Sequence, residues 1–402
     1  MNAIKKILPF FLMIFAVAVV AAVAHFAIEQ LSSPVSYFQP VDTRDGAELY
    51  KKELPNGNQA YLQVINVQKM QIDQLIGEVD RMAFNKGLYY QGENKYYSPF
   101  FKSKLFSEVT GEYKKLYGNG VFSVINCSFF EQYERSTQLS FPIKFNGQVI
   151  TGGNGIYGPV KKPKDGQYKN IRLKALVWND REAYITNYEP QTGKPLNQKE
   201  VQNAVVTYEY KHHPAKLISK NPANRYHVIG TLDKDGRKGN ELLAIITVNE
   251  ATLDTAGKLM REFGVKGDIV TIDGGLSTYL FNPKIGEIML PQSNNIATRE
   301  LPHYLGFRNR KSQTASPKIL VAKPAVQVQV EANKPYLILW RDNIEGEVKI
   351  ELYRENKLVE SIANRATSDG VYEWKPKIAV KSGSLIRISS VKNAKVSGAL
   401  QL

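Results

Sequence analysis

Cysteine is almost absent from this chain: among 402 residues, Cys127 is the only one. One cysteine cannot form an intramolecular disulfide, so a small disulfide-stapled scaffold is excluded and a hydrophobic core must stabilise the fold. Histidine is scarce too, with five copies and no H-x-x-x-H or other closed ligand spacing. We therefore predict no cofactor, and a divalent metal stays an open alternative. Internal repeats and long low-complexity tracts are also missing, which argues against a solenoid or propeller.

Acidic side chains are in the minority. The chain has 53 Lys and Arg against 38 Asp and Glu, which gives a formal net charge of +15. This excess favours anionic surroundings such as phosphorylated glycans, acidic envelope polymers or membrane surfaces, and a solvated lysine-rich surface is the alternative. With 43% hydrophobic side chains the chain can bury at least one substantial core, so a wholly disordered protein is excluded.

The first residues have the pattern of an export signal. Lys5 and Lys6 precede an almost unbroken apolar run over residues 7–24, which ends in an A-x-A pattern at residues 22–24. The run is also as long as a minimal membrane-spanning helix, so a cleaved signal peptide and an uncleaved anchor both stay open. Either one places the rest of the chain outside the cytoplasm, in the periplasm, the envelope or the extracellular space. Export disfavours nucleic acid as a partner, and only this segment is expected to contact a membrane.

Residues 40–309 mix strand-like runs with a helix, which predicts an α+β (mixed α/β) domain. The strand-like runs are residues 59–67, 121–125, 173–178, 241–248 and 268–272. A helix is predicted over residues 251–263, because apolar residues recur there at helical spacing and Gly264 follows as a stop.

The C-terminal part has a different pattern. A polar linker is predicted over residues 310–324, and a small all-β sandwich over residues 325–402. Short alternating runs indicate its strands, at residues 326–330, 336–340, 348–353 and 385–389. The pattern resembles the immunoglobulin-like modules attached to secreted cell-wall proteins, in whose core Trp340 and Trp374 are expected as anchors.

One short segment carries the strongest sign of chemistry. An apolar strand delivers Asp273, followed by Gly274 and Gly275. Paired glycines let the backbone turn sharply and bring N–H groups close to a phosphate or a developing oxyanion. Ser277 and Thr278 add hydroxyl groups, and Asp273 can serve as acid, base or nucleophile if burial and nearby cations set its pKa. The same Asp-Gly-Gly sequence is also an ordinary tight turn, so it does not identify a site alone.

Further segments change that balance. Asn126 closes a strand-like run, and Arg299 stands shortly before a proline. Together with Gly230 and the Asp273 loop, these segments resemble the phosphodiester glycosidase family over residues 121–307, with the same order and spacing. The family pattern has a strand ending in Asn-Gly-Gly-Phe-Phe, an Arg-Thr-Ala-(Ile/Val)-Gly segment, an Asp-Gly-Gly-Gly-Ser loop and a final arginine before proline.

The chain departs from this pattern at several positions. Residues 127–128 are Cys and Ser where the family has two glycines, and Leu276 replaces the third glycine of the loop. Residues 226–228 replace the Arg-Thr-Ala, and Arg225 lies one position before the expected arginine.

The resemblance implies an active site that is lined by Asn126, Asp273, Gly274, Gly275, Ser277 and Arg299. Four further candidates for substrate binding lie in or beside the matched segments: Thr278, Arg225, His227 and His303.

The roles follow from the chemistry of a sugar-1-phosphodiester, in which the anomeric carbon gains positive charge while phosphate leaves. We assign Asp273 to the anomeric carbon, Arg299 to the phosphate and Asn126 to sugar hydroxyls, with the glycine amides contacting the ligand. A second carboxylate is expected, for which Glu131 and Glu209 are candidates. His227 or His303 is an alternative general acid.

The sequence therefore predicts an exported hydrolase that cleaves a glycosyl phosphodiester or a related capped, anionic glycan. Two alternatives stay open: a non-catalytic envelope glycan-binding protein, and glycosyl transfer in exopolysaccharide assembly. The oligomeric state is not predicted.

Overall fold

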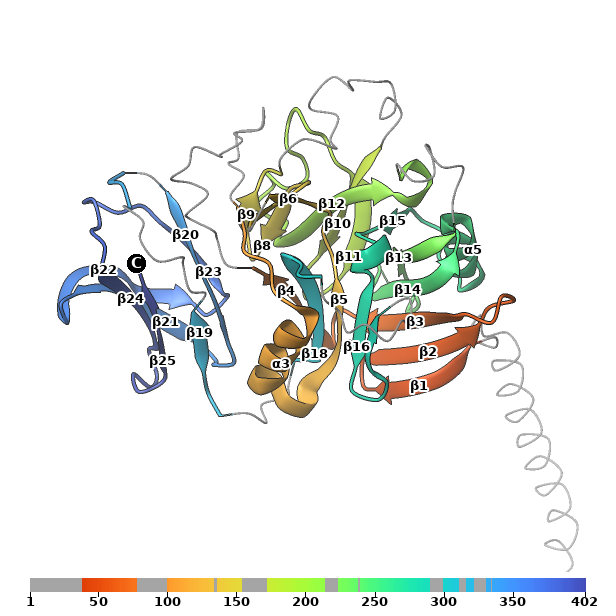
Figure 1. Cartoon of the computed structure of the whole chain (residues 1–402), viewed down its shortest axis with the longest axis horizontal. Helices are drawn as coiled ribbons and strands as arrows, with labels where there is room; N and C mark the ends of the chain where they lie inside the picture. Colours follow the sequence, from red (N-terminus) through yellow and green to blue (C-terminus); the bar gives the residue numbers. More distant parts are fainter. Residues whose placement is uncertain are drawn as a thin grey trace, which may run out of the picture.

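A computed structural model shows that the molecule is mostly β (Figure 1). It describes residues 38–77, 100–133, 136–153, 172–213, 223–237, 239–289, 299–310, 316–321, 330–333 and 335–402. Only two α-helices occur within these ranges, α3 (Phe106–Tyr117) and α5 (Leu253–Glu262). The prediction of an α+β domain was wrong in this respect, because antiparallel sheets rather than alternating strands and helices form the framework.

The larger sheet has the order β1-β2-β3-β14-β13-β15-β12-β10-β11, with β8 paired to both β12 and β9. Its pairings are antiparallel. The strands are β1 (Gln39–Arg44), β2 (Ala47–Glu53), β3 (Gln59–Asn66), β8 (Ile143–Phe145), β9 (Gln148–Thr151), β10 (Leu173–Trp178), β11 (Ala183–Asn187), β12 (Asn203–Glu209), β13 (Asn224–Leu232), β14 (Leu242–Ala251) and β15 (Ile269–Thr271).

The second sheet is antiparallel too and has the order β17-β16-β5-β18-β4. Its strands are β4 (Met70–Ile76), β5 (Val121–Asn126), β16 (Tyr279–Asn282), β17 (Gly286–Met289) and β18 (His303–Asn309). A separate hairpin joins β6 (Phe130–Tyr133) to β7 (Ser136–Leu139). Apolar residues of the two large sheets form one core, including Ile229 and Ile245 from the first and Ile125 and Phe307 from the second. The sheets therefore pack face to face.

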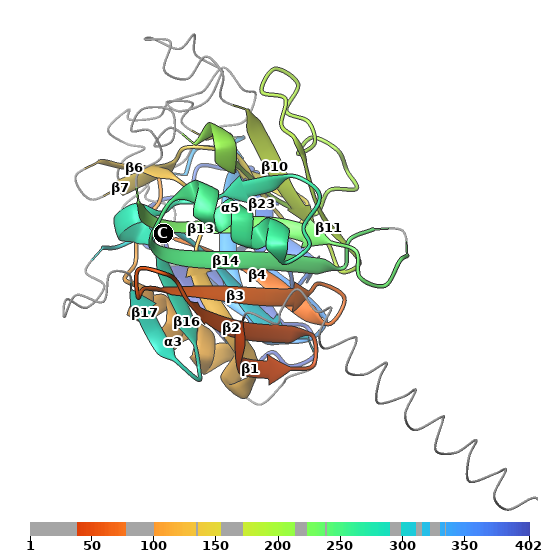
Figure 2. The same cartoon turned by 90° about the vertical axis from the view of Figure 1, so that its right-hand side faces the viewer.

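Helix α5 explains why the sequence looks like an alternating α/β chain. It connects β14 to β15, and both strands pair antiparallel with β13 between them. The two strands are therefore parallel to each other, and α5 crosses β13 and packs on the outer face of the sheet (Figure 2). Its start is capped by the Thr252 hydroxyl, which accepts a hydrogen bond from the Thr255 N–H at 3.0 Å.

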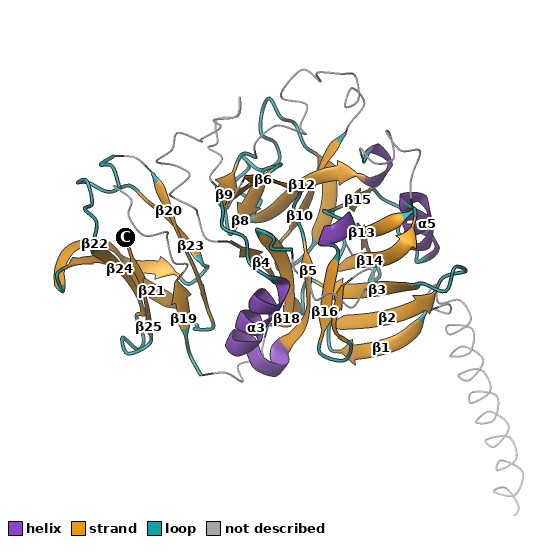
Figure 3. Ribbon diagram, in the orientation of Figure 1, coloured by secondary structure: helices purple, strands orange, loops and turns teal. Residues whose placement is uncertain are grey.

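Helix α3 packs against the second sheet, on the face that points away from the large sheet (Figure 3). Phe106, Val109, Tyr113 and Leu116 form its buried stripe. The sequence does not show this helix clearly, because Gly111 and several β-branched and aromatic residues lower its helix propensity and no Ser, Thr, Asp or Asn precedes it.

The C-terminal residues form two further antiparallel sheets. Their strands are β19 (Ile319–Val321), β20 (Tyr336–Asp342) and β23 (Val371–Trp374), and then β22 (Lys357–Thr367), β21 (Glu347–Arg354), β24 (Ser384–Ser390) and β25 (Ser397–Gln401). A core that contains Trp340 and Trp374 is shared by both sheets, which confirms the two tryptophans as core anchors. The immunoglobulin-like topology and the domain boundaries stay predictions.

The predicted export segment, residues 1–24, lies outside the described residues, as does most of the predicted linker. Among the helices that can be described, none is long and apolar enough to cross a membrane.

Candidate functional site

The segments that resemble the phosphodiester glycosidase family meet in space. The Asp273 N–H donates to the carbonyl oxygen of Cys127 at 2.8 Å, and the Cys127 N–H donates to that of His303 at 3.1 Å. The Ile272 N–H reaches the carbonyl oxygen of His227 at 3.4 Å. The last residues of β5 and β15 and the first residue of β18 therefore come together beside the first half of β13 (Figure 1).

The buried Asn126 side chain forms hydrogen bonds with three neighbouring segments. Its side chain is 1% exposed, and its Oδ1 accepts hydrogen bonds from His227 Nε2 at 2.8 Å and from the Tyr279 N–H at 2.9 Å. Its Nδ2 donates to the carbonyl oxygen of Asp273 at 2.6 Å. These contacts hold the Asp273 loop against β5 and β13, and the assignment of Asn126 to sugar hydroxyls stays a prediction.

His227 supports Asn126. Burial lowers the pKa of the His227 imidazole to about 3, so the ring is neutral at physiological pH. Because the Asn126 amide oxygen can only accept, His227 Nε2 carries the proton and Nδ1 accepts from the Thr247 hydroxyl at 2.8 Å. Both ring nitrogens are therefore occupied, which argues against His227 as a general acid.

Asp273 is the titratable group at the point where the strands meet. Burial raises the pKa of its carboxyl to about 7, and the Ser277 hydroxyl, the Arg299 guanidinium and the Gly274 N–H oppose this rise. The Gly274 N–H donates to Asp273 Oδ1 at 3.1 Å, whereas the Ser277 hydroxyl lies nearby without a hydrogen bond of good geometry. A carboxyl with this pKa can change protonation near neutral pH, as acid or base catalysis requires.

The two glycines shape the loop for different reasons. Gly275 begins a 3-10 turn, η3 (Gly275–Ser277), with φ +61°, a conformation that favours glycine. A Cβ on Gly274 would lie 2.7 Å from the carbonyl oxygen of Arg225, so the loop packs directly on the backbone of β13. Thr278 is fully buried, and its hydroxyl has no hydrogen-bond partner among the residues that the structure describes.

Two arginines border the loop. Arg299 lies over the Phe130 ring, with 5.1 Å between its guanidinium carbon and the ring centroid. Its positive charge acts to lower the pKa of Asp273. Arg225 donates from Nη1 to the Gly275 carbonyl oxygen at 3.4 Å, and its Nε is buried without a partner in the described part of the chain. Both guanidinium groups keep donors that an anionic ligand can use.

His303 and Cys127 are buried behind the loop. His303 Nδ1 lies 2.7 Å from the Ser128 hydroxyl oxygen, and burial lowers the pKa of this imidazole to about 3. Burial also raises the pKa of the Cys127 thiol far above its ordinary value, which argues against a nucleophilic thiolate. Because the pKa of His303 is so low, its imidazole is neutral at pH 7 and is not a good general acid.

The structure does not bring the candidate second carboxylates to Asp273. Glu209 Oε2 lies 3.1 Å from His212 Nδ1, and Glu131 lies in the β6–β7 hairpin opposite Gln138. Within the described residues, neither has a contact with Asp273.

An aromatic group that the sequence analysis missed adjoins the loop. The Tyr226 ring would lie 3.4 Å from a Cβ on Gly274, and the His213 ring lies 6.1 Å from Tyr226 and 5.5 Å from Phe129. Burial lowers the pKa of His213 to about 4, so its ring is neutral. The Phe-Phe pair after Ser128 was the available signal, because it places aromatic rings directly after the matched strand end.

Three carboxylates elsewhere lie within 4.8 Å of one another: Asp233, Asp235 and Glu241, on the connection between β13 and β14. The Glu241 carboxylate accepts from the Lys234 N–H at 3.1 Å. None of these residues belongs to the Asp273 site, so they do not bear on its chemistry.

Comparison with known proteins finds only distant similarity. No family model matches the chain, and no curated protein matches it. The catalytic domain of zebrafish N-acetylglucosamine-1-phosphodiester alpha-N-acetylglucosaminidase, auto-inhibited by its pro-peptide, is 12% identical with a TM-score of 0.43, over 68% of this chain and 88% of that chain. A hypothetical protein from Synechocystis is 11% identical with a TM-score of 0.36, over 68% of this chain and 64% of that chain. The likeness is too distant to assign a function.

Proposed function

We propose that this chain is a hydrolase that cleaves a glycosyl phosphodiester at the Asp273 site. The observation that carries the proposal is the Asp273 carboxyl itself, whose pKa is raised to about 7 by burial and which lies beside Arg299. A carboxylate for the sugar and guanidinium groups for the phosphate are what this reaction requires.

The reaction breaks the bond between the anomeric carbon and the phosphate oxygen. The bonding electrons leave with the phosphate, and water supplies the new bond to the anomeric carbon. Arg225 and Arg299 would bind the phosphate oxygens and stabilise the charge that grows on them. Ionised Asp273 would stabilise positive charge at the anomeric carbon and accept a proton from the attacking water. Asn126 and His227 would hold the loop in place.

The setting of the reaction is part of the proposal. The export pattern of residues 1–24 favours a reaction outside the cytoplasm, and the net charge of +15 favours a phosphorylated or otherwise anionic glycan. The half-buried Phe129 ring lies beside the loop and packs against His213, which in turn packs against the buried Tyr226 ring, and an apolar ring at this place suits a sugar.

The test is release of sugar from a panel of aryl and nucleotide-linked sugar-1-phosphodiesters, with and without a chelator. Asp273→Ala is expected to lower kcat by about 10²- to 10⁴-fold, because positioned acid–base groups contribute this much. Asp268→Asn is the matched control, since Asp268 precedes the same strand but pairs with Lys174 at 2.8 Å on a partly exposed surface. In the wild type, kcat is expected to fall as the pH drops below about 7, because Asp273 becomes protonated.

Full activity of Asp273→Ala would refute the proposal. A non-catalytic glycan-binding protein is the second candidate, favoured by Leu276, which is 68% exposed where the family pattern has a glycine and so changes the surface that a substrate approaches. Binding of these diesters by a folded protein without turnover would support that candidate. Sugar transfer to an added acceptor, at the expense of hydrolysis, would identify a transferase.

A further inference from the structure

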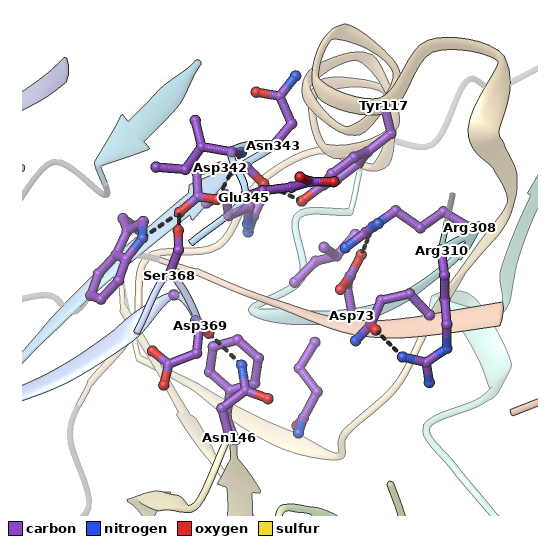
Figure 4. Close-up of a pocket in the computed structure, with 18 residues that line it drawn as sticks. Asp73, Tyr117, Asn146, Arg308, Arg310, Asp342, Asn343, Glu345, Ser368 and Asp369 are labelled. Carbon is purple, nitrogen blue, oxygen red and sulfur yellow. Dashed lines mark hydrogen bonds and ion pairs between the residues drawn. The ribbon is translucent and has the colours of Figure 1, made fainter. Parts of the chain in front are cut away.

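A cavity of about 420 Å³ suggests a second site (Figure 4). It lies between the part of the molecule that contains the two large sheets and the C-terminal sheets. One wall comes from β4 and the end of β18, and the other from β20, the loop after it and the β22–β23 turn. Small-molecule sites have this size and often form where two structural units meet. None of the predicted residues of the Asp273 site lines this cavity.

On the β18 wall, Arg310 forms no ion pair with any described residue, and Asp180 and Asp73 act on its charge only from a distance. Arg308 is neutralised by Asp73, with 2.6 Å between Nε and Oδ2. Arg310 instead donates to neutral acceptors, the Gln71 Oε1 at 2.9 Å and the Val67 carbonyl oxygen at 2.8 Å. Its Nε is buried and has no hydrogen-bond partner among the described residues. Arg310 therefore keeps its net charge, and each Nη keeps an N–H group beyond the one that these hydrogen bonds use.

The opposite wall carries three carboxylates, Asp342, Glu345 and Asp369, together with Arg341, which pairs with Glu112. Asp342 Oδ2 accepts from Trp340 Nε1 at 2.6 Å and from the Ser368 hydroxyl, and Oδ1 accepts from the Ile344 N–H at 3.2 Å. All three donors are neutral. Asp369 Oδ1 accepts from the Val371 N–H at 3.3 Å, and the N–H of Asp369 itself also acts on the carboxyl. No ion pair of Asp342 or Asp369 occurs in the described part of the chain. Burial is the main reason why the pKa of each of these two carboxyls is raised, that of Asp369 to about 6.

This arrangement restricts the ligand. A polyanion would meet the carboxylates, and a simple cation would meet Arg310, so neither suits the whole cavity. A sugar with one acidic group suits both walls, because its hydroxyls donate to carboxylates and its anionic group binds a guanidinium. Tyr117, Phe145 and Trp340 also line the cavity. Arg308 covers the Tyr117 ring and Trp340 is buried, so the half-buried Phe145 ring provides the apolar surface.

We propose that this cavity binds an acidic saccharide, with the acidic group at Arg310 and hydroxyl groups at Asp342 and Asp369. The site is distinct from the Asp273 site and does not depend on the function proposed there.

The experiment is isothermal titration calorimetry of the full chain with a tetrasaccharide of galacturonic acid, and with neutral maltotetraose as the matched ligand. The acidic ligand is expected to bind at least tenfold more tightly than the neutral one. Arg310→Gln is expected to weaken acidic binding at least tenfold, because a charge-assisted hydrogen bond is lost. Asp369→Asn is expected to weaken it several-fold.

Galactose 6-phosphate distinguishes a phosphate from a carboxylate as the acidic group, and binding of either that is lost in Arg310→Gln supports the proposal. The double variant Asp273→Ala/Arg299→Gln controls for binding at the other site and is expected to retain full affinity. Equal binding of neutral and acidic ligands, no binding of any, or affinity lost in the double variant but kept in Arg310→Gln would overturn the proposal. Asp369→Asn keeps the side-chain shape, so it tests the site even if Arg310→Gln does not fold.

Discussion

The Asp273 carboxyl shows how a single residue can oppose folding while it serves a site. Its folded pKa of about 7 lies above the ordinary value of about 4 that it regains in the unfolded chain. Below pH 4 both states are protonated, so the shift has no effect. Between pH 4 and 7 the folded state holds a proton that the unfolded state releases, so the free energy of unfolding falls as the pH rises. Above pH 7 the carboxyl is ionised in both states, and the destabilisation by the buried charge is at its full value.

Asp273→Asn is therefore expected to stabilise the fold at alkaline pH only. We expect the free energy of unfolding to rise by on the order of 2 kcal/mol at pH 8, since one pKa unit corresponds to about 1.4 kcal/mol and the side chain is partly exposed. At pH 3.5 no change is expected. Urea unfolding at both pH values measures this, with Asp45→Asn on the surface as the control. An equal change at both pH values would contradict the expected linkage.

The sequence groups Asn126, Asp273 and Arg299 through a motif, and the structure brings these residues together. That they line an active site stays a prediction. The motif does not show that His227 and Tyr279 occupy the Asn126 amide, because those contacts depend on how distant strands pair. Arg310 and Asp369 lie in segments without a motif, so no local pattern points to their cavity.

Single elements were predicted well where the apolar pattern is strong. The run at residues 173–178 coincides with β10, and the helix predicted at residues 251–263 contains α5. The predicted fold class was wrong, because it depends on how these elements pair with one another. A helix between two apolar strands is typical of a βαβ unit, whereas here β13 lies between those strands and makes the sheet antiparallel.

The Asp273 loop is expected to be intolerant of a single methyl group at Gly274. The new Cβ would lie 2.7 Å from the carbonyl oxygen of Arg225, which is backbone and cannot move aside easily. Gly274→Ala should therefore shift the loop, lower kcat by about 10²-fold or more and destabilise the fold by about 1–3 kcal/mol. Gly267→Ala is the matched control, because nothing lies within 4 Å of its added Cβ. Equal activity of both variants would show that the loop tolerates the shift.

At the scale of the whole molecule, the C-terminal sheets are joined to the large sheets by buried contacts. Leu337, Leu339 and Val371 belong to the core that the two large sheets share. The Tyr117 hydroxyl donates to the carbonyl oxygen of Asp342 at 2.6 Å. The sequence predicts a linker and a separate sandwich from polarity and turn residues alone, and such a pattern contains no information about this contact surface.

Substitution of Arg341 tests how much the contact between the C-terminal sheets and the large sheets contributes to stability. Arg341 lies in β20, and its guanidinium donates to the Ile76 carbonyl oxygen at 2.9 Å and lies 3.4 Å from Glu112, both in the other unit. Arg341→Ala removes the hydrogen bond to Ile76 and leaves Glu112 with Lys104 alone among the described residues, so we expect a loss of about 1–3 kcal/mol in the free energy of unfolding. Calorimetric unfolding should then change from one transition to two, or to one at lower temperature. Arg365→Ala is the control, because Arg365 is 69% exposed and pairs with Glu347 at 3.3 Å within one sheet, where less than about 0.5 kcal/mol is expected. Equal effects of the two variants would mean that the interface contributes no more stability than a surface ion pair.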